Sequence, residues 1–368
     1  LSKSRLAQLT GLSIPAVSNI LEELLDEGRI SHSAEKMSAR GLNSGSYQIP
    51  HHGAWTLCMT VSPTSIECQL ADARLLAVGD LQHITINAPD PQTLLGAIAN
   101  CWRQYHKRYP EQRINLALGV HGQVDPVTGV SQTMPQAQWK APLEMKYLLE
   151  EQLGIHVRID NDCVMLALAE KWQNPGADQD FCVINVDYGI GSSFVINDQI
   201  YRGNLYGSGQ IGHTIVDPDG NACDCGRYGC LETIASLSAL KKQARVWLKT
   251  QPGAEFSPEQ LTTSALIHAW QQGDVRVQAW VENAANAIGL SLYNFLNILN
   301  INQIWLYGRS CAFGESWLNA ITHQTGFNPF DKNDGPGIKA THISFGRLSR
   351  TQQILGIGYL YVESQLGE

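Results

Sequence analysis

The sequence predicts an α/β protein of two or three domains, preceded by a small helical unit. The chain has 368 residues, more than one ordinary domain holds. From Trp55 onward, apolar strand-like runs follow one another and then alternate with helical runs, which is typical of an α/β sheet domain long enough to repeat. Residues 1–50 instead carry helical spacing and turn signals.

Composition narrows the class of protein. The hydrophobic fraction of 43% suits a globular chain, and the absence of any apolar run long enough to span a bilayer predicts no membrane insertion. No signal peptide is visible, so we expect a cytoplasmic protein, although the chain starts at Leu1 and its natural N-terminus should lie upstream. The net charge of -8 argues against non-specific coating of nucleic acid. Acidic and basic residues balance within residues 1–50, so any DNA contact should be local to that end.

The first fifty residues predict two helices joined by a tight turn. Leu6 and Leu9 give a short apolar face that Gly11 ends. Ser13 is a natural N-cap, and Pro15 falls in the first turn of a second helix that reaches Gly28. This is the helix-turn-helix layout, and an ordinary helical hairpin is the alternative.

The segment after Gly28 has the features of a wing. Two short strand-like pieces flank a stretch with basic residues and glycines, which suits a hairpin that reaches the phosphates or the minor groove of an operator duplex. If the second helix lies in the major groove, its first turns face base edges. The predicted DNA contacts are Ser13, Ala16, Ser18, Asn19, Arg29, Lys36 and Arg40.

Nine cysteines divide into two groups. Cys58, Cys68, Cys101, Cys163, Cys182 and Cys311 stand in apolar surroundings, as buried thiols of a reducing compartment do. The others form a cluster with a histidine: His213, Cys223, Cys225 and Cys230. Three thiolates and one imidazole are the closed tetrahedral ligand set of a structural site, so we predict one Zn²⁺ per chain. The alternatives are three reduced cysteines, or one disulfide and a spare thiol.

Four stretches resemble one known family. The run "TGLSIPAVSNILEELLDEG" is similar to the DNA-binding module of repressors of the ROK (repressor, open reading frame, kinase) family. "LALGVHGQVDPVTGV", where the family has "GIPGxVDxxxG", and "IDNDCVMLALAE" follow. The last stretch runs from "VDYGIGSS" through "GQIGH" to "CDCGRYGCLET". The chain is thereby identified as a member of the repressor branch, similar to the bacterial glucose and N-acetylglucosamine-type repressors.

The resemblance implies a domain plan. It consists of a winged helix-turn-helix over residues 1–50 and two actin-like/hexokinase-like (ribonuclease H-like) lobes of the sugar-kinase fold with a sugar cleft between them. Residues 51–161 and 348–368 would form the first lobe, and 162–347 the second, with the zinc loop and an oligomerisation surface. Part of that surface is expected on the apolar helix near 275–300, through Ile288, Leu292, Phe295, Leu296 and Leu299. Burial within the chain is the favoured explanation for most of these residues.

The resemblance also implies ligand-binding residues. Asp162 matches the general base of the family's kinases, which takes a proton from a sugar hydroxyl. Asn161, Gln210, His213 and Glu232 match sugar contacts, with Gln210 standing where the kinases have Glu. Read from the residues alone, Asn-Asp between a strand and a helix is a common N-cap. In "MPQAQWKAPLE", Gln136 replaces a sugar-binding Asn, which leaves open a different sugar, a phosphorylated sugar or a degenerate pocket.

The phosphate-holding motifs are degraded. The kinases open their first lobe with "DxGGT", whose backbone N–H groups approach phosphate, but "TVSPTSIE" stands here, and Pro63 has no N–H. The glycine turn on the adenosine side contains Arg309 and Ser310. We therefore expect no enzyme activity, with Asp162 as a degenerate general base.

These observations predict a sequence-specific regulator, a repressor, of carbohydrate metabolism genes. Its effector would be a sugar or sugar phosphate, and as a homodimer or homotetramer it would read a pseudo-palindromic operator. One alternative is an active ATP-dependent sugar kinase, which a coupled ATPase assay with a sugar panel distinguishes. The other is a regulator sequestered by a sugar-transport protein, which rests on analogy alone.

Overall fold

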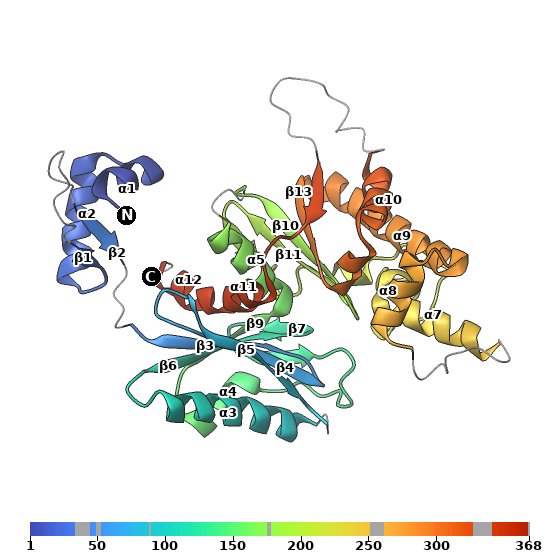
Figure 1. The fold of residues 1–368 in the computed structure, drawn as a ribbon, viewed down its shortest axis with the longest axis horizontal. Helices are drawn as coiled ribbons and strands as arrows, with labels where there is room; N and C mark the ends of the chain where they lie inside the picture. Colours follow the sequence, from blue (N-terminus) through green and yellow to red (C-terminus); the bar gives the residue numbers. More distant parts are fainter. Residues whose placement is uncertain are drawn as a thin grey trace.

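The computed structural model describes residues 1–33, 45–48, 53–87, 90–174, 178–250, 261–326 and 341–366. The N-terminal unit is a pair of helices with a two-stranded antiparallel sheet: α1 (Lys3–Thr10), α2 (Ile14–Asp26), β1 (Ser31–Ser33) and β2 (Ser46–Gln48). Ala7, Val17 and Leu21 form its small core, and Figure 1 shows it beside the larger body at the start of the chain. Both predicted helices are present.

The first large sheet carries the strands β3 to β6 and β9. The order is β5-β4-β3-β6-β9, with antiparallel pairing up to β3 and parallel pairing beyond it. Its strands are β3 (Trp55–Val61), β4 (Ser65–Ala71), β5 (Ala77–Thr85), β6 (Ile114–Val120) and β9 (Val157–Asn161). Helices α3 (Pro91–Arg108) and α4 (Met145–Leu153) cover one face, below the sheet in Figure 1, and the small hairpin β7 (Gln123–Asp125) and β8 (Val130–Thr133) adjoins the end of β6.

The second sheet repeats that plan. Its order is β12-β11-β10-β13-β14, again antiparallel up to β10 and parallel beyond. The strands are β10 (Phe181–Val186), β11 (Ile190–Ile196), β12 (Gln199–Tyr201), β13 (Gln303–Tyr307) and β14 (His342–Phe345). The helices packed with it are α6 (Glu232–Ala235), α7 (Leu237–Lys249), α8 (Thr263–Gln271), α9 (Val275–Leu299) and α10 (Glu315–Thr325). Helices α7 and α8 were not foreseen in the sequence.

Helix α5 (Asp162–Gln173) joins the two sheets. A shared core contains Cys58 and Ala117 from the first sheet, Phe181 and Val183 from the second, and residues 164–168 of α5. The C-terminal helices α11 (Arg350–Leu355) and α12 (Tyr359–Leu366) pack against α5 and lie over the first sheet in Figure 1. The start of α5 is therefore fixed between the lobes.

Burial settles two expectations from the sequence. On α9, Ile288, Leu292, Phe295 and Leu296 are core residues, as favoured, whereas Leu299 is exposed. Five of the six scattered cysteines are buried, but Cys311 is only half-buried. Within the described ranges, none of the helices combines the length and the apolar composition that crossing a membrane requires.

An ion pair ties the first sheet to the second lobe close to α5. Asp160 on β9 is buried, and its Oδ2 atom accepts from Nε and lies by Nη2 of Arg202, both at 2.9 Å, just after β12. Burial raises the pKa of Asp160, and Arg202 opposes that shift. The charge of the buried Asp160 carboxylate is thus compensated by Arg202.

We predict that Arg202→Met lowers the free energy of unfolding by about 3–5 kcal/mol, because it leaves a buried carboxylate uncompensated. Adding Asp160→Asn should recover most of this loss. The control is Arg74→Met, which breaks the more exposed Arg74–Asp72 pair and should cost under about 1 kcal/mol. Urea unfolding measures all three; equal losses for Arg202→Met and Arg74→Met would show that the buried pair is not needed.

Candidate functional site

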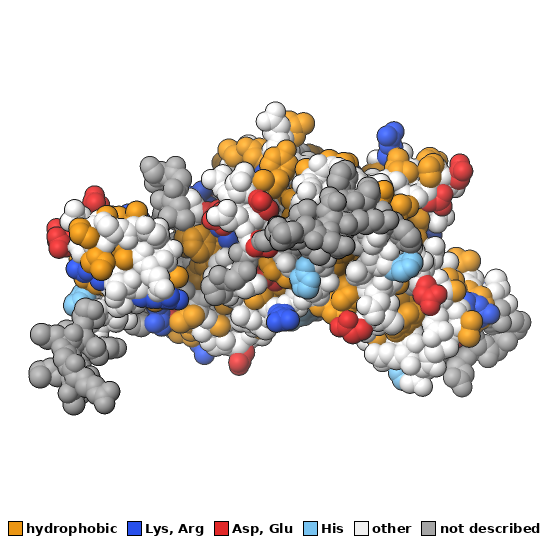
Figure 2. Space-filling model, turned by 90° about the horizontal axis from the view of Figure 1, so that it is seen from above, with side chains coloured by type: hydrophobic (Ala, Val, Ile, Leu, Met, Phe, Trp, Pro, Cys, Tyr) orange, Lys and Arg blue, Asp and Glu red, His pale blue; other side chains and the backbone are white. Residues whose placement is uncertain are grey.

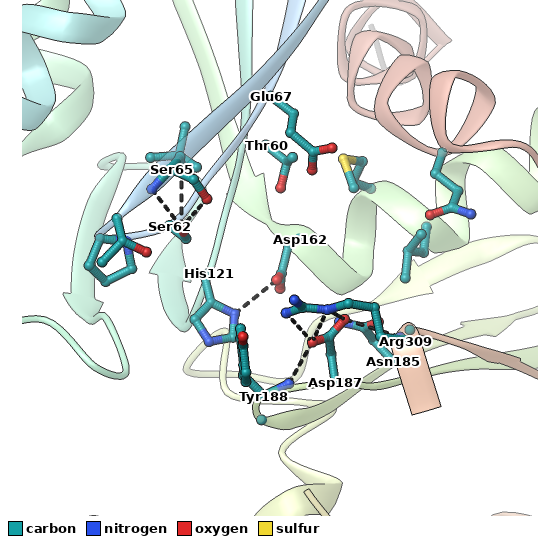
Figure 3. Close-up of a pocket in the computed structure, with 18 of the residues that line it drawn as sticks. Thr60, Ser62, Ser65, Glu67, His121, Asp162, Asn185, Asp187, Tyr188 and Arg309 are labelled. Carbon is teal, nitrogen blue, oxygen red and sulfur yellow. Dashed lines mark hydrogen bonds and ion pairs between the residues drawn. The ribbon is translucent and has the colours of Figure 1, made fainter. Parts of the chain in front are cut away.

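A cavity of about 550 Å³ opens beside the start of α5. Its walls come from the β3–β4 turn, the end of β6, the β10–β11 turn and the segments after β13 and at the start of α11. Figure 3 shows Asp162 pointing into the middle of it, with side chains of both lobes around. The structure therefore puts the predicted Asp162 in a cleft between the lobes.

Asp162 is paired with a histidine that the sequence analysis did not single out. Nδ1 of His121 lies 3.0 Å from Oδ2 of Asp162 (Figure 3). Burial lowers the pKa of His121, but the nearby carboxylates of Asp162, Glu232 and Asp187 together outweigh burial, so the pKa of His121 is raised. The signal was available in "GVHGQVD", where His121 stands in the place of Pro in the family motif.

The β3–β4 turn is closed on itself. The N–H of Ser62 donates to the Ser65 carbonyl at 2.9 Å, and the N–H of Ser65 donates to Oγ of Ser62 at 3.1 Å. Pro63 between them has no N–H to offer. The Ser62 and Ser65 amides are consequently engaged within the turn.

Two arginines in the cavity are bound to carboxylates. Arg309 donates through Nη2 to Oδ1 of Asp187 at 2.6 Å, and its guanidinium carbon lies 4.0 Å from the centroid of the Tyr188 ring. Arg350 donates through Nε to Oε2 of Glu67 at 3.1 Å. Arg309, predicted to intrude on the adenosine side, thus lies in the cleft wall.

The other predicted sugar contacts are not among the residues that line this cavity. Asn161 caps α5, with Oδ1 accepting from the Cys163 N–H at 2.7 Å and Nδ2 donating to the Gly122 carbonyl at 2.5 Å. Asn161 and Gln210 line a second pocket of only about 20 Å³. Oε2 of Glu232 accepts from the Ile190 N–H at 2.9 Å. Their roles as sugar ligands stay predictions.

The predicted metal ligands do come together. The ligand atoms of His213, Cys223, Cys225 and Cys230 all lie within 4.8 Å of one another, close enough for one metal ion to take all four. Sγ of Cys223 is 3.5 Å from Nδ1 of His213, and Sγ of Cys225 is 3.6 Å from Sγ of Cys230. Soft thiolates with one imidazole suit zinc chemistry.

A tight turn returns Cys230 to the cluster. Gly229 has φ of 67°, and a Cβ there would lie 1.4 Å from the Asp217 carbonyl oxygen, so only glycine fits. Ile215 and Cys230 form an isolated antiparallel bridge beside it. The ligand spacing and the glycine turn thus build one loop.

The predicted DNA contacts that the structure describes fall on α2, on its N-cap and on the segment between α2 and β1. Ser13 caps α2 by accepting from the Ala16 N–H, and the Ser18 hydroxyl donates to the Ile14 carbonyl. Asn19 and Arg29 are exposed. Lys36 and Arg40 lie outside the described residues.

Comparison with known proteins identifies the family. The pattern that defines the ROK family matches residues 56–342, so the chain belongs to the ROK family. It is 68% identical to the protein YphH of Escherichia coli over 99% of this chain and 92% of that protein. It is 25% identical to the transcriptional dual regulator NagC of Escherichia coli, over 87% of this chain and 80% of that protein. It is 23% identical to the xylose repressor of Caldicellulosiruptor bescii, over 87% of this chain and 82% of that protein.

Solved structures share the fold. A ROK family transcriptional regulator described as a homologue of the Escherichia coli MLC protein superposes with a TM-score of 0.77 at 20% identity, over 99% of this chain and 94% of that one. A ROK glucokinase from Streptomyces griseus, in complex with glucose and AMPPNP, gives a TM-score of 0.70 at 20% identity over 83% and 99%. The α/β architecture is the sugar-kinase-like fold of the ROK family, and the solved structures that share it include both a regulator and an enzyme.

We predict that His121→Gln lowers stability more at about pH 5.5 than at about pH 9. A pKa raised in the folded chain means that the stabilisation is fully present below the unfolded pKa and disappears as the pH rises through the folded pKa. Urea unfolding of the variant and the parent at each pH measures the difference in their free energies of unfolding. The titration of groups that both chains share cancels in that difference. Substitution of the exposed His156 is the control, and a pH-independent loss for His121→Gln would contradict the pairing.

Proposed function

We propose that this chain is a cytoplasmic, sequence-specific transcription regulator, a repressor of carbohydrate genes, in which a kinase-like part senses a sugar-type effector without phosphorylating it. The observation that carries the proposal is the closed Ser62–Ser65 turn in a chain that also has a capped two-helix unit at its start. With the Ser62 and Ser65 amides bonded within the turn and no N–H on Pro63, the turn lacks the run of backbone donors that a phosphate cradle uses, and phosphoryl transfer depends on such positioning. Repressors among the relatives support the same conclusion.

The N-terminal unit would read DNA through α2. Its exposed first turns would enter the major groove, with Arg29 and the segment that follows on phosphate. Two units related by two-fold symmetry in a homodimer or homotetramer would match a pseudo-palindromic operator. Charges visible on the described surface in Figure 2 are scattered rather than gathered in one basic field, which suits local, specific contacts over non-specific coating.

Selection of duplexes with the full chain tests this proposal. We expect a specific sequence to be enriched, and Asn19→Ala to weaken binding to it by about 1–3 kcal/mol through one lost base contact. Arg29→Gln should lower the slope of log affinity against log salt by about one phosphate contact. The exposed Arg103 on α3 provides the control substitution, Arg103→Gln, which should change neither. A chain that enriches no sequence would refute DNA reading.

The metal centre would stabilise the loop next to the effector site. We propose that the His213–Cys223–Cys225–Cys230 cluster holds one structural Zn²⁺, supported by its ligand chemistry and by the convergence of four ligand atoms. With four protein ligands the ion has no position for water, so its contribution is to loop order, not to chemistry.

We predict one zinc per chain by elemental analysis. Cys225→Ser should remove the metal and lower the melting temperature, because binding free energy of a structural metal is folding free energy. Cys311→Ser, at the half-buried cysteine outside the cluster, should keep the full zinc content. Retention of zinc by Cys225→Ser would show that the ligand set is wrong.

A further inference from the structure

Two buried thiols meet between the first sheet and the helix that covers it. Cys68 lies on β4 and Cys101 on α3, and their Sγ atoms are 3.4 Å apart. Both residues are buried in the core that α3 closes over the sheet. Neither belongs to the metal cluster, and neither is among the residues that line the cavity. The pair therefore has no part in the effector site or the metal centre.

Cys58, on the neighbouring strand β3, shows what a buried thiol without such a contact looks like. Its Sγ atom lies 4.0 Å from the Thr56 carbonyl oxygen, and burial raises the pKa of Cys58 to about 12. A thiol that stays protonated in an apolar core is inert, because the thiolate is the reactive form of cysteine. Cys68 and Cys101 differ from Cys58 because each has a second sulfur within contact distance.

The contact between the two thiols favours a thiolate on one of them. A hydrogen bond from Cys101 lowers the pKa of Cys68, burial opposes this change, and Tyr105, one turn further along α3, adds to the lowering. The same contact, together with burial, raises the pKa of Cys101. Cys68 is thus the nucleophile of the pair, and Cys101 is the thiol that can resolve an oxidised Cys68.

The two sulfurs are close enough to bond after a small movement. A disulfide has its sulfurs about 2.0 Å apart, so the pair must close by roughly 1.4 Å, a shift that side-chain rotation at two residues can share. We propose that Cys68 and Cys101 are an oxidation site. Hydrogen peroxide converts the pair to a disulfide that joins α3 to β4, and a thiol reductant reverses the reaction.

The reaction removes two electrons from the pair and gives them to the peroxide. The Cys68 thiolate attacks one peroxide oxygen, the O–O bond breaks, and the departing hydroxide takes up the proton that Cys68 lost. Cys68 is then a sulfenic acid. The Cys101 sulfur attacks the Cys68 sulfur, the S–S bond forms, the S–O bond breaks, and the oxygen leaves as water with the Cys101 proton. Two thiols and one peroxide thus give one disulfide and two waters.

Peroxide treatment of the full chain, followed by digestion and mass spectrometry without reductant, tests the oxidation site. Trypsin cleaves after Arg74 and Arg103, so Cys68 and Cys101 fall in different peptides, 41–74 and 75–103. We expect these peptides to be found joined, lighter than their sum by the hydrogens lost, and to be released by dithiothreitol. Free thiols at both positions, or a sulfinic acid at either one without a link, would overturn the proposal.

Cysteine variants assign the link to this pair. Peptide 41–74 also contains Cys58, so Cys58→Ala is the matched control and should keep the link. Cys101→Ala and Cys68→Ala should each abolish it, and either variant suffices if the other fails to fold. A link that persists in Cys101→Ala or disappears in Cys58→Ala would show that the wrong thiols were assigned.

Thermal melting reports what the link does to the first lobe. A bond between Cys68 and Cys101 restricts the unfolded chain, so peroxide should raise the melting temperature of the parent by several degrees relative to its effect on Cys101→Ala. Oxidation of the metal-cluster cysteines affects both chains and cancels in that comparison. An identical response of the two chains to peroxide would show that α3 and β4 are not joined in the folded protein.

Discussion

Close packing around helix α5 is the constraint on which the rest of the structure depends. Residues 163–170 of this helix are buried against both sheets. A Cβ at Gly356 would lie 2.1 Å from the Met165 carbonyl oxygen, and one at Gly119 would lie 3.1 Å from the Met165 sulfur. Because such a close-packed interior leaves no room for a shift, packing fixes the position of the helix. Asp162 lies in the first turn of this helix, and its carboxylate, paired with His121 after β6, lines the cavity.

Local patterns predicted much of the fold and the metal cluster. Helix-end signals such as Gly11, Ser13 and Pro15 influence only the few residues around them, and the Cys223–Cys225–Cys230 spacing is equally local. Such features can therefore be recognised in the sequence itself. The shared order of the two sheets was visible only loosely, because it arises from parallel pairs such as β10 with β13, more than a hundred residues apart. Helices α7 and α8 were not predicted, although Leu237, Leu240 and Ala244 of α7 stand at helical spacing and are buried.

The cavity shows the same division between local and distant information. A motif pointed to Asp162, but not to its partner His121, 41 residues earlier. Nor could it reveal the Glu67–Arg350 contact, whose members are 283 residues apart. Arg309 was foreseen as an intrusion, whereas its engagement with Asp187 requires the β10–β13 neighbourhood. Sequence patterns therefore identified residue types suited to the site, and only the fold shows which charges cancel.

The metal cluster and the cavity are joined by a short run of hydrogen bonds. Two residues after Cys230, the Glu232 carboxylate accepts from the Ile190 N–H in the β10–β11 turn, and the Leu237 N–H donates to the Asp187 carbonyl. That turn carries Asp187, whose side chain binds Arg309 in the cavity wall. A ligand shifts a conformational equilibrium only through unequal affinity for the two states. A preference of that kind for one arrangement of the Asp187 turn would reach the ligand cluster through these two hydrogen bonds, which join the turn to the residues that follow Cys230.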